Sequence, residues 1–476
     1  MKKLANILTI TFILLFFYLT KDINILPLTI SFSMYILFSS IFSTTSIKKV
    51  IEVYHDKKYY YSRNKILYYT LTLVTIIGLI LTIISYSVGE FLNIEKINII
   101  NIFMTISLIS NILLKIIKEY IEVIGYKKIS NNLINLYKVV VLTINVILSI
   151  LLFKVFKLES YINYIMLYSV SVIVFIIAVI LLYILILHKK NKYNKKNEEN
   201  KKINIKDVKK IIINTQIQTI YNITRATYIY ISIIVLYYIL TNKYNYSYNI
   251  VGNLITNTYF YGMFIFYYIN KIIEKYLNID YDTIKENFDS NINKITKLSL
   301  NLCILLAVIS IPLNNLIFRN DYNILSSLIP LLFFYILYNY IININIKYNK
   351  DKKNLIILLL GIITKIIFEL PLINSIYRMG FSLTLGSILS IILGMIVSII
   401  LGLIFIKSKF KLNLLNNFNN ILNIVYESII YCLILVLFTL IIKVDTVGII
   451  NSLLVVIFYI FITILFHIIK RILTKK

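Results

Sequence analysis

The sequence predicts an all-α polytopic membrane protein with about fourteen transmembrane helices, arranged as two six-helix lobes plus two C-terminal helices. Of the 476 residues, 59% are apolar, whereas soluble domains are about 45–50% apolar. The mean hydropathy is +0.83. The apolar residues gather in stretches close to the roughly 20 residues that a helix needs to cross a bilayer. Because lipid-facing backbone must pair its polar groups internally, these stretches are predicted to be helices.

The predicted spans follow one another with short polar breaks. Lys2 and Lys3 precede the first apolar run, and no small-residue cleavage site follows it, which favours a membrane helix over a signal peptide. The spans are predicted at approximately 4–20, 23–47, 66–88, 97–117, 133–153, 161–187, 211–240, 248–270, 295–318, 324–346, 354–376, 380–406, 421–442 and 447–469.

Two longer polar breaks divide the chain. The lysine-rich segment 188–210 follows the sixth span and is predicted to be a basic cytoplasmic linker. The predicted organisation is therefore an N-lobe at 1–187, this linker, a C-lobe at 211–406, and a C-terminal region at 407–476 with two further helices and a basic end. Two lobes in the same orientation are typical of transporters that bind substrate between them.

The second break, 271–294, follows the eighth span. Apolar residues recur there every three to five positions among charges, at Ile279, Ile284, Phe288, Ile292 and Ile295. This spacing predicts an amphipathic helix on the inner membrane surface.

The basic residues predict the orientation. The net charge is +28, and most of the 49 Lys and Arg residues lie in alternate loops and at the termini. The few in the other loops are Lys21, Lys96, Lys154, Lys157, Lys243, Arg319, Arg378 and Lys443. This is the positive-inside pattern, so both termini are predicted to be cytoplasmic in a bacterial cell membrane. The charge is attributed to orientation and to anionic membrane lipids, and nucleic acid is not an expected partner.

The sequence contains little catalytic or metal-binding chemistry. Its two cysteines, Cys303 and Cys432, lie in apolar spans, and the three histidines are far apart. No phosphate-binding loop, nucleophile motif or metal-ligand spacing is present. We therefore predict that the protein is not an enzyme and needs no cofactor.

Arg225 is the first candidate site residue, midway along the span at 211–240. Asn214, Gln218, Asn222 and Arg225 are spaced by four, four and three residues and share one helix face. A charge in a membrane helix is expensive and normally faces a cavity or a partner. One interpretation of the stripe is a cationic contact for an anionic headgroup, because a planar guanidinium binds phosphate oxygens in pairs. The other is a hydrogen-bonded contact between helices, or snorkelling of the arginine towards the membrane surface.

Lys365 and Glu369 are the second candidate, at the centre of the span 354–376. Four residues apart, they can pair on one helix face. The hypotheses are a self-neutralised pair, a cavity cation tuned by a carboxylate, or a proton or sodium coupling site. Lys138, near the cytoplasmic end of the span 133–153, is a weaker candidate for which snorkelling is the simpler account.

The segment 361–407 resembles the polysaccharide transporter and stage V sporulation protein B-like branch of the multidrug/oligosaccharidyl-lipid/polysaccharide flippase superfamily, which is similar to the lipid II flippases. The matching positions are Gly361, Lys365, Leu372, Ile373, Gly380, Thr384 and Gly386. Residues 291–318 resemble the entry to the family's ninth helix, and 41–69 its second-to-third helix connection.

This resemblance implies a flippase that moves a polyprenyl-diphosphate-linked oligosaccharide, such as lipid II, to the outer leaflet by alternating access. It places Lys365 at the family's helix-eleven lysine and Arg225 in the helix that borders the cavity. A monovalent cation or the membrane potential is an implied driving partner. The chain departs from the family pattern in helices 1, 2 and 7. In helix 7, Ser232 stands near the position of an expected Asp. Two alternatives therefore stay open: a cation-coupled multidrug exporter, with Glu369 as the coupling carboxylate, and a degenerate, non-transporting scaffold.

Overall fold

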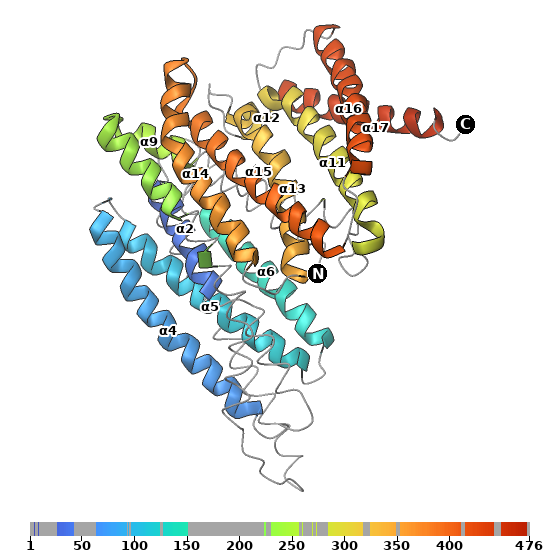
Figure 1. Cartoon of the computed structure of the whole chain (residues 1–476). Coiled ribbons are helices and arrows are strands. Elements are labelled where there is room, and N and C mark those ends of the chain that lie inside the picture. The colour runs from blue at the N-terminus through green and yellow to red at the C-terminus, as the bar shows by residue number, and fades with distance from the viewer. Residues whose placement is uncertain are drawn as a thin grey trace. The chain divides into compact units, whose positions relative to one another are not determined.

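The fold is all-α throughout the described part of the chain, in which no strand occurs. We analysed a computed structural model (Figure 1). It describes residues 26–41, 63–92, 97–123, 127–150, 230–256, 284–317, 324–348, 353–410, 415–441 and 449–473, with the single positions 4, 8, 94, 223, 224, 259, 269 and 273.

The polytopic prediction is confirmed. Within the described ranges, seven helices are long and apolar enough to cross a membrane, and two shorter apolar helices cover Leu26–Ser40 and Tyr230–Lys243. The seven spans are Val74–Leu92, Ile97–Glu122, Leu328–Asn345, Asn354–Arg378, Leu385–Phe410, Asn420–Thr439 and Asn451–Ile468. The predicted span at 161–187 and the predicted linker at 188–210 lie outside the described residues, as does the predicted span at 4–20 apart from Leu4 and Leu8.

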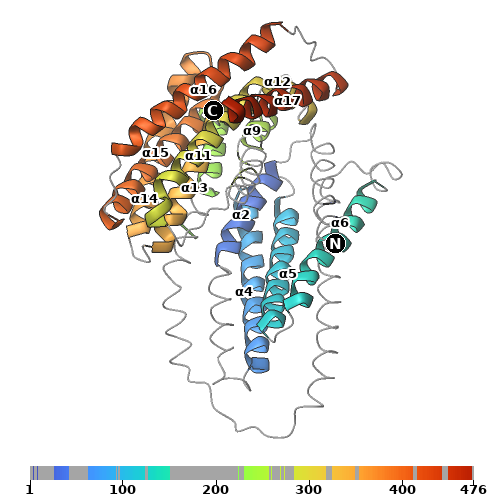
Figure 2. The same cartoon turned by 90° about the vertical axis from the view of Figure 1, so that its right-hand side faces the viewer.

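The chain divides into two compact units, Met1–Val235 and Leu236–Lys476. The described helices of the first unit are α2 (Leu26–Ile41), α4 (Arg63–Leu92), α5 (Ile97–Val123) and α6 (Lys127–Ile150). Helix α5 packs against each of the other three, and Figure 2 shows it beside α4. Its Leu108, Ile116 and Ile117 are buried in the core of this unit, which explains the apolar face of α5.

In the second unit the structure describes a longer series of helices. They are the short π-helix η3 (Ile239–Lys243), α9 (Tyr248–Ile255), α11 (Ile284–Val308), α12 (Ser310–Ile317), α13 (Ile324–Tyr348), α14 (Lys353–Arg378), α15 (Leu383–Phe410), α16 (Leu415–Ile441) and α17 (Ile449–Leu473). Helix α15 packs against both α13 and α14, while α11 packs against α13 and α16. Helix α15 therefore lies at the centre of a three-helix layer (Figure 1).

The prediction of a separate surface helix before residue 295 is wrong for the part that the structure describes. Helix α11 begins at Ile284 and continues without interruption to Val308. Phe288, Ile292 and Ile295 are buried, and the ring of Phe288 stacks on that of Tyr340 in α13, with ring centroids 6.3 Å apart. The periodic apolar face thus packs against protein rather than lipid headgroups.

The predicted span 295–318 is divided by a break at Ile309, where α11 ends and α12 begins. Pro312 lies three residues into α12 and carries no backbone N–H, so the carbonyl of Val308 loses the helical partner it would otherwise have. The amide of Leu313 still donates to the carbonyl of Ile309 at 2.9 Å. The proline therefore marks a helix start at a local bend in the chain.

The last two helices are attached to this bend by an apolar cluster. Tyr431 of α16 is fully buried, and its hydroxyl lies 2.8 Å from the hydroxyl of Thr463 in α17. Ile309, Leu435 and Tyr459 complete the buried core of the cluster, together with Val455 and Ile462. The opposite faces of α16 and α17 are exposed and apolar, as expected for helix surfaces in contact with lipid tails.

Candidate functional site

The helix pair α14–α15 is joined by a tight turn at Gly380. This glycine has a φ of +80°, a left-handed conformation that favours glycine. The amide of Phe381 donates to the carbonyl of Ile376 at 3.1 Å, and the amide of Gly380 to the carbonyl of Tyr377 at 3.0 Å. These bonds satisfy the last carbonyls of α14 and return the chain directly into α15.

Small residues let the two helices approach closely. A Cβ atom at Gly394 would lie 2.6 Å from the carbonyl oxygen of Gly361, and one at Gly386 would lie 2.6 Å from the Cα of Ile373. Along α15 a small residue recurs at every fourth position, at Gly386, Ser390, Gly394, Ser398 and Gly402. Such stripes are typical of tight helix packing in membranes.

Lys365 and Glu369 form an ion pair on the face of α14 that meets this stripe. Lys365 Nζ donates to Glu369 Oε2 at 2.6 Å. Their side chains are 0% and 3% exposed, respectively. The predicted pairing at a spacing of four residues is therefore observed, and both charges are withdrawn from lipid and water.

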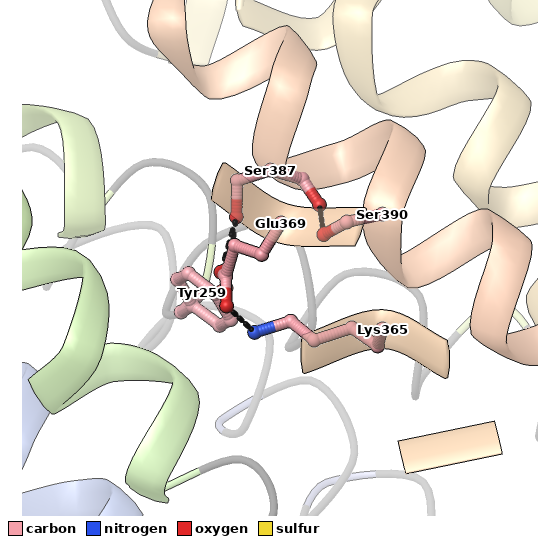
Figure 3. A network of polar contacts seen from close by, with 5 residues as sticks. All are labelled: Tyr259, Lys365, Glu369, Ser387 and Ser390. Atoms are coloured by element: carbon pink, nitrogen blue, oxygen red, sulfur yellow. Dashed lines mark hydrogen bonds and ion pairs between the residues drawn. The ribbon is translucent and has the colours of Figure 1, made fainter. Parts of the chain in front are cut away.

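A chain of hydroxyl groups from other segments leads to the carboxylate of this pair (Figure 3). Ser387 of α15 donates to Glu369 Oε1 at 3.4 Å. The hydroxyl of Tyr259 lies 3.1 Å from that of Ser387, and Ser390 donates to the carbonyl of Ser387 at 2.7 Å. The site thus combines one ammonium, one carboxylate and buried hydroxyls.

The pair lies near the middle of a membrane span. Lys365 is the twelfth residue of the 25-residue span Asn354–Arg378, about 17 Å from its start at 1.5 Å per residue. A charged residue at that depth costs about 2.5–3.5 kcal/mol on insertion scales. Direct pairing and hydrogen bonding offset this cost, because each charge has its counter-charge within reach.

The other predicted site residues are distributed differently. Gln218, Asn222 and Arg225 lie outside the described residues, and Lys138 lies in α6 at a position whose side chain is not described. Lys365 and Glu369 are the two candidates that the structure brings together. Among the described residues, no group of three or more His, Cys, Asp and Glu side chains could hold a metal ion.

Sequence reasoning missed Ser387 and Tyr259 as members of this site. Ser387 follows Gly386 in the small-residue stripe, and this pattern could have indicated a residue close to α14. Tyr259 is one of 40 tyrosines in the chain, and no local signal distinguishes it. Its place beside Glu369 depends on a contact between segments more than one hundred residues apart.

A second buried polar network holds the first unit together. Asn101 of α5 accepts a hydrogen bond from Ser31 of α2 at 2.6 Å and donates to the carbonyl of Ser85 in α4 at 2.9 Å. The hydroxyls of Ser85 and Thr105 lie 3.1 Å apart. This network carries no charge and joins three helices, so it is explained by helix packing.

A tyrosine cluster lies where η3 and α14 end. The hydroxyl of Tyr244 donates to Asn374 Oδ1, and the rings of Tyr244 and Tyr377 meet edge to face at 5.8 Å. Tyr246 lies in the loop after η3, and its hydrogen bond with Tyr377 is the main cause that raises its pKa to about 12. Both segments are predicted to end on the outer side, where tyrosines commonly line the membrane interface.

Comparisons with known proteins identify the fold. The structure resembles that of the lipid II flippase MurJ in an inward closed conformation, with a TM-score of 0.61 and 14% identity over 97% of this chain and 98% of that one. It also resembles a multidrug resistance MATE family transporter of the MOP superfamily. The outward-facing structure gives a TM-score of 0.55 and 12% identity, over 86% of this chain and 96% of that one.

The inward-facing structure of a MATE family transporter gives a TM-score of 0.53 and 13% identity, over 83% of this chain and 94% of that one. No family model and no curated protein matches the sequence. The chain therefore has the fold of the superfamily of flippases and multidrug transporters that its sequence resembles. At these identities the likeness concerns the fold alone.

Proposed function

We propose that this protein is a flippase that moves a polyprenyl-diphosphate-linked oligosaccharide from the inner to the outer leaflet by alternating access. The observation that carries the proposal is the extent of the fold likeness. The likeness to the lipid II flippase covers 97% of this chain, whereas that to the outward-facing multidrug transporter covers 86%. The part of this chain that the second likeness leaves uncovered is similar in length to residues 407–476, which contain α16 and α17.

The packing of those last helices supports the proposal. Tyr431 buries its whole side chain between α16 and α17, and Ile309 links the pair to the junction of α11 and α12. Helices held in this way belong to the folded body of the second unit. Twelve helices would suit a drug exporter of the same superfamily, and the additional pair favours the lipid-linked cargo.

A diphosphate headgroup needs cationic contacts in a hydrated cavity. Arg225 is the residue we assign to this role, with Gln218 and Asn222 on the same predicted helix face. Lys138 is a further candidate nearer the cytoplasmic end of its helix. Lys365 is a poorer candidate because its charge is already matched by Glu369 at 2.6 Å and is shielded from solvent. We assign it a structural role within α14 and α15.

The second candidate function is cation-coupled drug export. It is favoured by the fold likeness to the multidrug transporters and by a buried carboxylate in the membrane, Glu369. The ion pair argues against it, because the ammonium of Lys365 already neutralises that carboxylate. A third candidate, a scaffold without transport, gains no support from these contacts.

The deciding experiment uses the purified full-length protein in liposomes. Three cargoes are compared: lipid II, an undecaprenyl diphosphate carrying a single sugar, and a lipophilic cationic dye. We expect transbilayer movement of one or both diphosphate lipids and none of the dye. Arg225→Ala is expected to slow this movement at least tenfold, and Arg225→Lys less, because a point charge replaces a planar guanidinium.

Arg378→Ala is the matched control, since Arg378 lies in the last turn of α14, at its predicted outer end. It should leave the rate unchanged. Headgroup capture in a hydrated cavity should also weaken as salt is raised, because ions screen the charges. Movement of the dye alone would establish the exporter in place of the flippase. Movement of no cargo, with the protein folded, would establish the scaffold.

A further inference from the structure

The surroundings of Glu369 form a cluster of oxygen atoms inside the membrane. Glu369 contributes two carboxylate oxygens, Ser387 one hydroxyl at 3.4 Å, and Tyr259 another hydroxyl at 3.1 Å from that of Ser387. Hard cations such as Na⁺ are bound in proteins by oxygen ligands of these types. An unpaired carboxylate at this depth would therefore attract a small cation from solution or bind a proton.

The ammonium of Lys365 already occupies this position. Its Nζ lies 2.6 Å from Glu369 Oε2 (Figure 3), and the side chain is 0% exposed. The ammonium is a compact point charge at the end of a flexible stem, so it resembles a bound monovalent ion in size and charge. Unlike such an ion, it is tethered to the chain one helical turn from its partner.

We propose that the Lys365 ammonium is a built-in monovalent cation, which neutralises Glu369 and fills a latent site that would otherwise take an alkali cation or a proton from solution. The oxygen cluster is the latent site, and Lys365→Met exposes it. The wild-type protein therefore needs neither ion at this position to keep α14 and α15 packed.

The close packing of α14 against α15 explains why the site at Glu369 would have to hold a cation if Lys365 were removed. The side chains of Glu369, Ser387 and Ser390 are buried at a contact where α15 approaches α14 through Gly394 and Gly386. Among the described residues, the titratable groups that face Glu369 are Lys365 on the same helix and Tyr259. Helix α15 contributes the hydroxyl of Ser387, while that of Ser390 donates to the carbonyl of Ser387. Removal of the ammonium thus leaves one net negative charge in a buried site, which favours uptake of a cation.

The test measures the melting temperature of the purified full-length protein in detergent. Sodium chloride is compared with choline chloride at constant ionic strength, at neutral and at alkaline pH. The wild type should melt at the same temperature in both salts. Lys365→Met should melt lower in choline and regain roughly 2 °C or more in sodium, because a ligand that binds only the folded state stabilises it.

If Lys365→Met melts at a higher temperature at neutral than at alkaline pH, and sodium has no effect, the proton is the ion that replaces the ammonium. In either case the double variant Lys365→Met/Glu369→Gln should melt at a temperature that depends on neither sodium nor pH, because no buried carboxylate remains to be neutralised. Lys297→Met is the matched control. It removes an ion pair of the same 2.6 Å length with Glu427, but these side chains are 38% and 40% exposed, so the charge left behind is not enclosed by protein. It should acquire no ion dependence.

Two results would overturn the inference. One is a sodium-dependent rise in the melting temperature of the wild type that Glu369→Gln abolishes, since the site would then bind an ion despite Lys365. The other is a folded Lys365→Met protein that responds to sodium and pH as the wild type does. Should Lys365→Met fail to fold in both salts, the wild-type measurement and the milder Lys365→Gln variant decide the question. The readout is stability, so it is independent of whether the proposed flippase activity is found.

Discussion

Gly361 of α14 and Gly394 of α15 face each other so closely that a Cβ atom on Gly394 would lie 2.6 Å from the carbonyl oxygen of Gly361. The same atom would lie 3.1 Å from the Cβ of Lys365. The approach of two backbones therefore sets the position of the buried ion pair. Substitutions at this contact should affect the pair as well as the packing.

Gly394→Ala is expected to lower the free energy of unfolding by about 1–3 kcal/mol, because overpacking forces the two helices apart. Thermal or denaturant unfolding of the detergent-purified protein measures this loss. Ser408→Thr adds a methyl group at an exposed position near the end of the same helix and should change stability little. Equal stability of the two variants would contradict the close approach of α14 and α15.

Breaking the buried pair should cost more than removing it. Lys365→Met and Glu369→Gln each leave one partner buried without its counter-charge, and each is expected to destabilise the protein by about 3–5 kcal/mol. The double variant should lose less than the sum of the single losses, because no isolated charge remains. A double-mutant cycle by denaturant unfolding measures this coupling. Additive losses would mean that the two side chains do not act as a pair.

Asn101→Ala removes the centre of the network that joins α2, α4 and α5. Its amide donates to the carbonyl of Ser85 and its carbonyl accepts from Ser31. Hydrogen bonds between membrane helices contribute about 0.6 kcal/mol on average and up to about 1.7 kcal/mol. We therefore expect a loss of about 1 kcal/mol in unfolding measurements, smaller than that for the ion pair. Thr75→Ala, on the exposed face of α4, should have no measurable effect.

Tyr431→Ala should loosen the attachment of α16 and α17. The side chain is fully buried, and its ring lies tilted against that of Phe466, with ring centroids 5.1 Å apart. Truncation of a buried aromatic residue costs about 3–5 kcal/mol. Tyr431→Phe should cost only about 0.5–1.5 kcal/mol, since it loses one hydrogen bond to Thr463. Melting temperatures would reveal the difference, with Tyr426→Ala at a 66% exposed position of the same helix as control.

The membrane orientation predicts a labelling pattern. In a background without Cys303 and Cys432, a cysteine at Asn245 should react with an impermeant thiol reagent added outside intact cells. A cysteine at the terminal Lys476 should react only after the cells are permeabilised. Tyr244 and Asn374 are in contact, as expected of two residues that are predicted near the same side of the membrane. Labelling of Lys476→Cys in intact cells would reverse the predicted orientation.

Features that depend on neighbouring residues could be predicted from the sequence. The spans at 324–346 and 354–376 coincide closely with α13 (Ile324–Tyr348) and α14 (Lys353–Arg378). The pairing of Lys365 with Glu369 follows from the four-residue spacing of one helix turn. The length of an apolar stretch and its helical periodicity are local properties, so they do not depend on how the rest of the chain packs.

Features that depend on distant contacts could not be predicted in this way. The face at Phe288 and Ile292 has the pattern of a surface helix, yet α13 covers it, because an apolar stripe does not reveal whether protein or a membrane surface will bury it. The positions of Tyr259 and Ser387 near Glu369 could not be predicted either, because they depend on contacts between segments that are distant in the sequence. The sequence by itself determined that this is a helical membrane protein with a charge pair inside one span. Only the tertiary structure decided that the pair is sealed from solvent, because its burial depends on the glycine-mediated approach of a second helix.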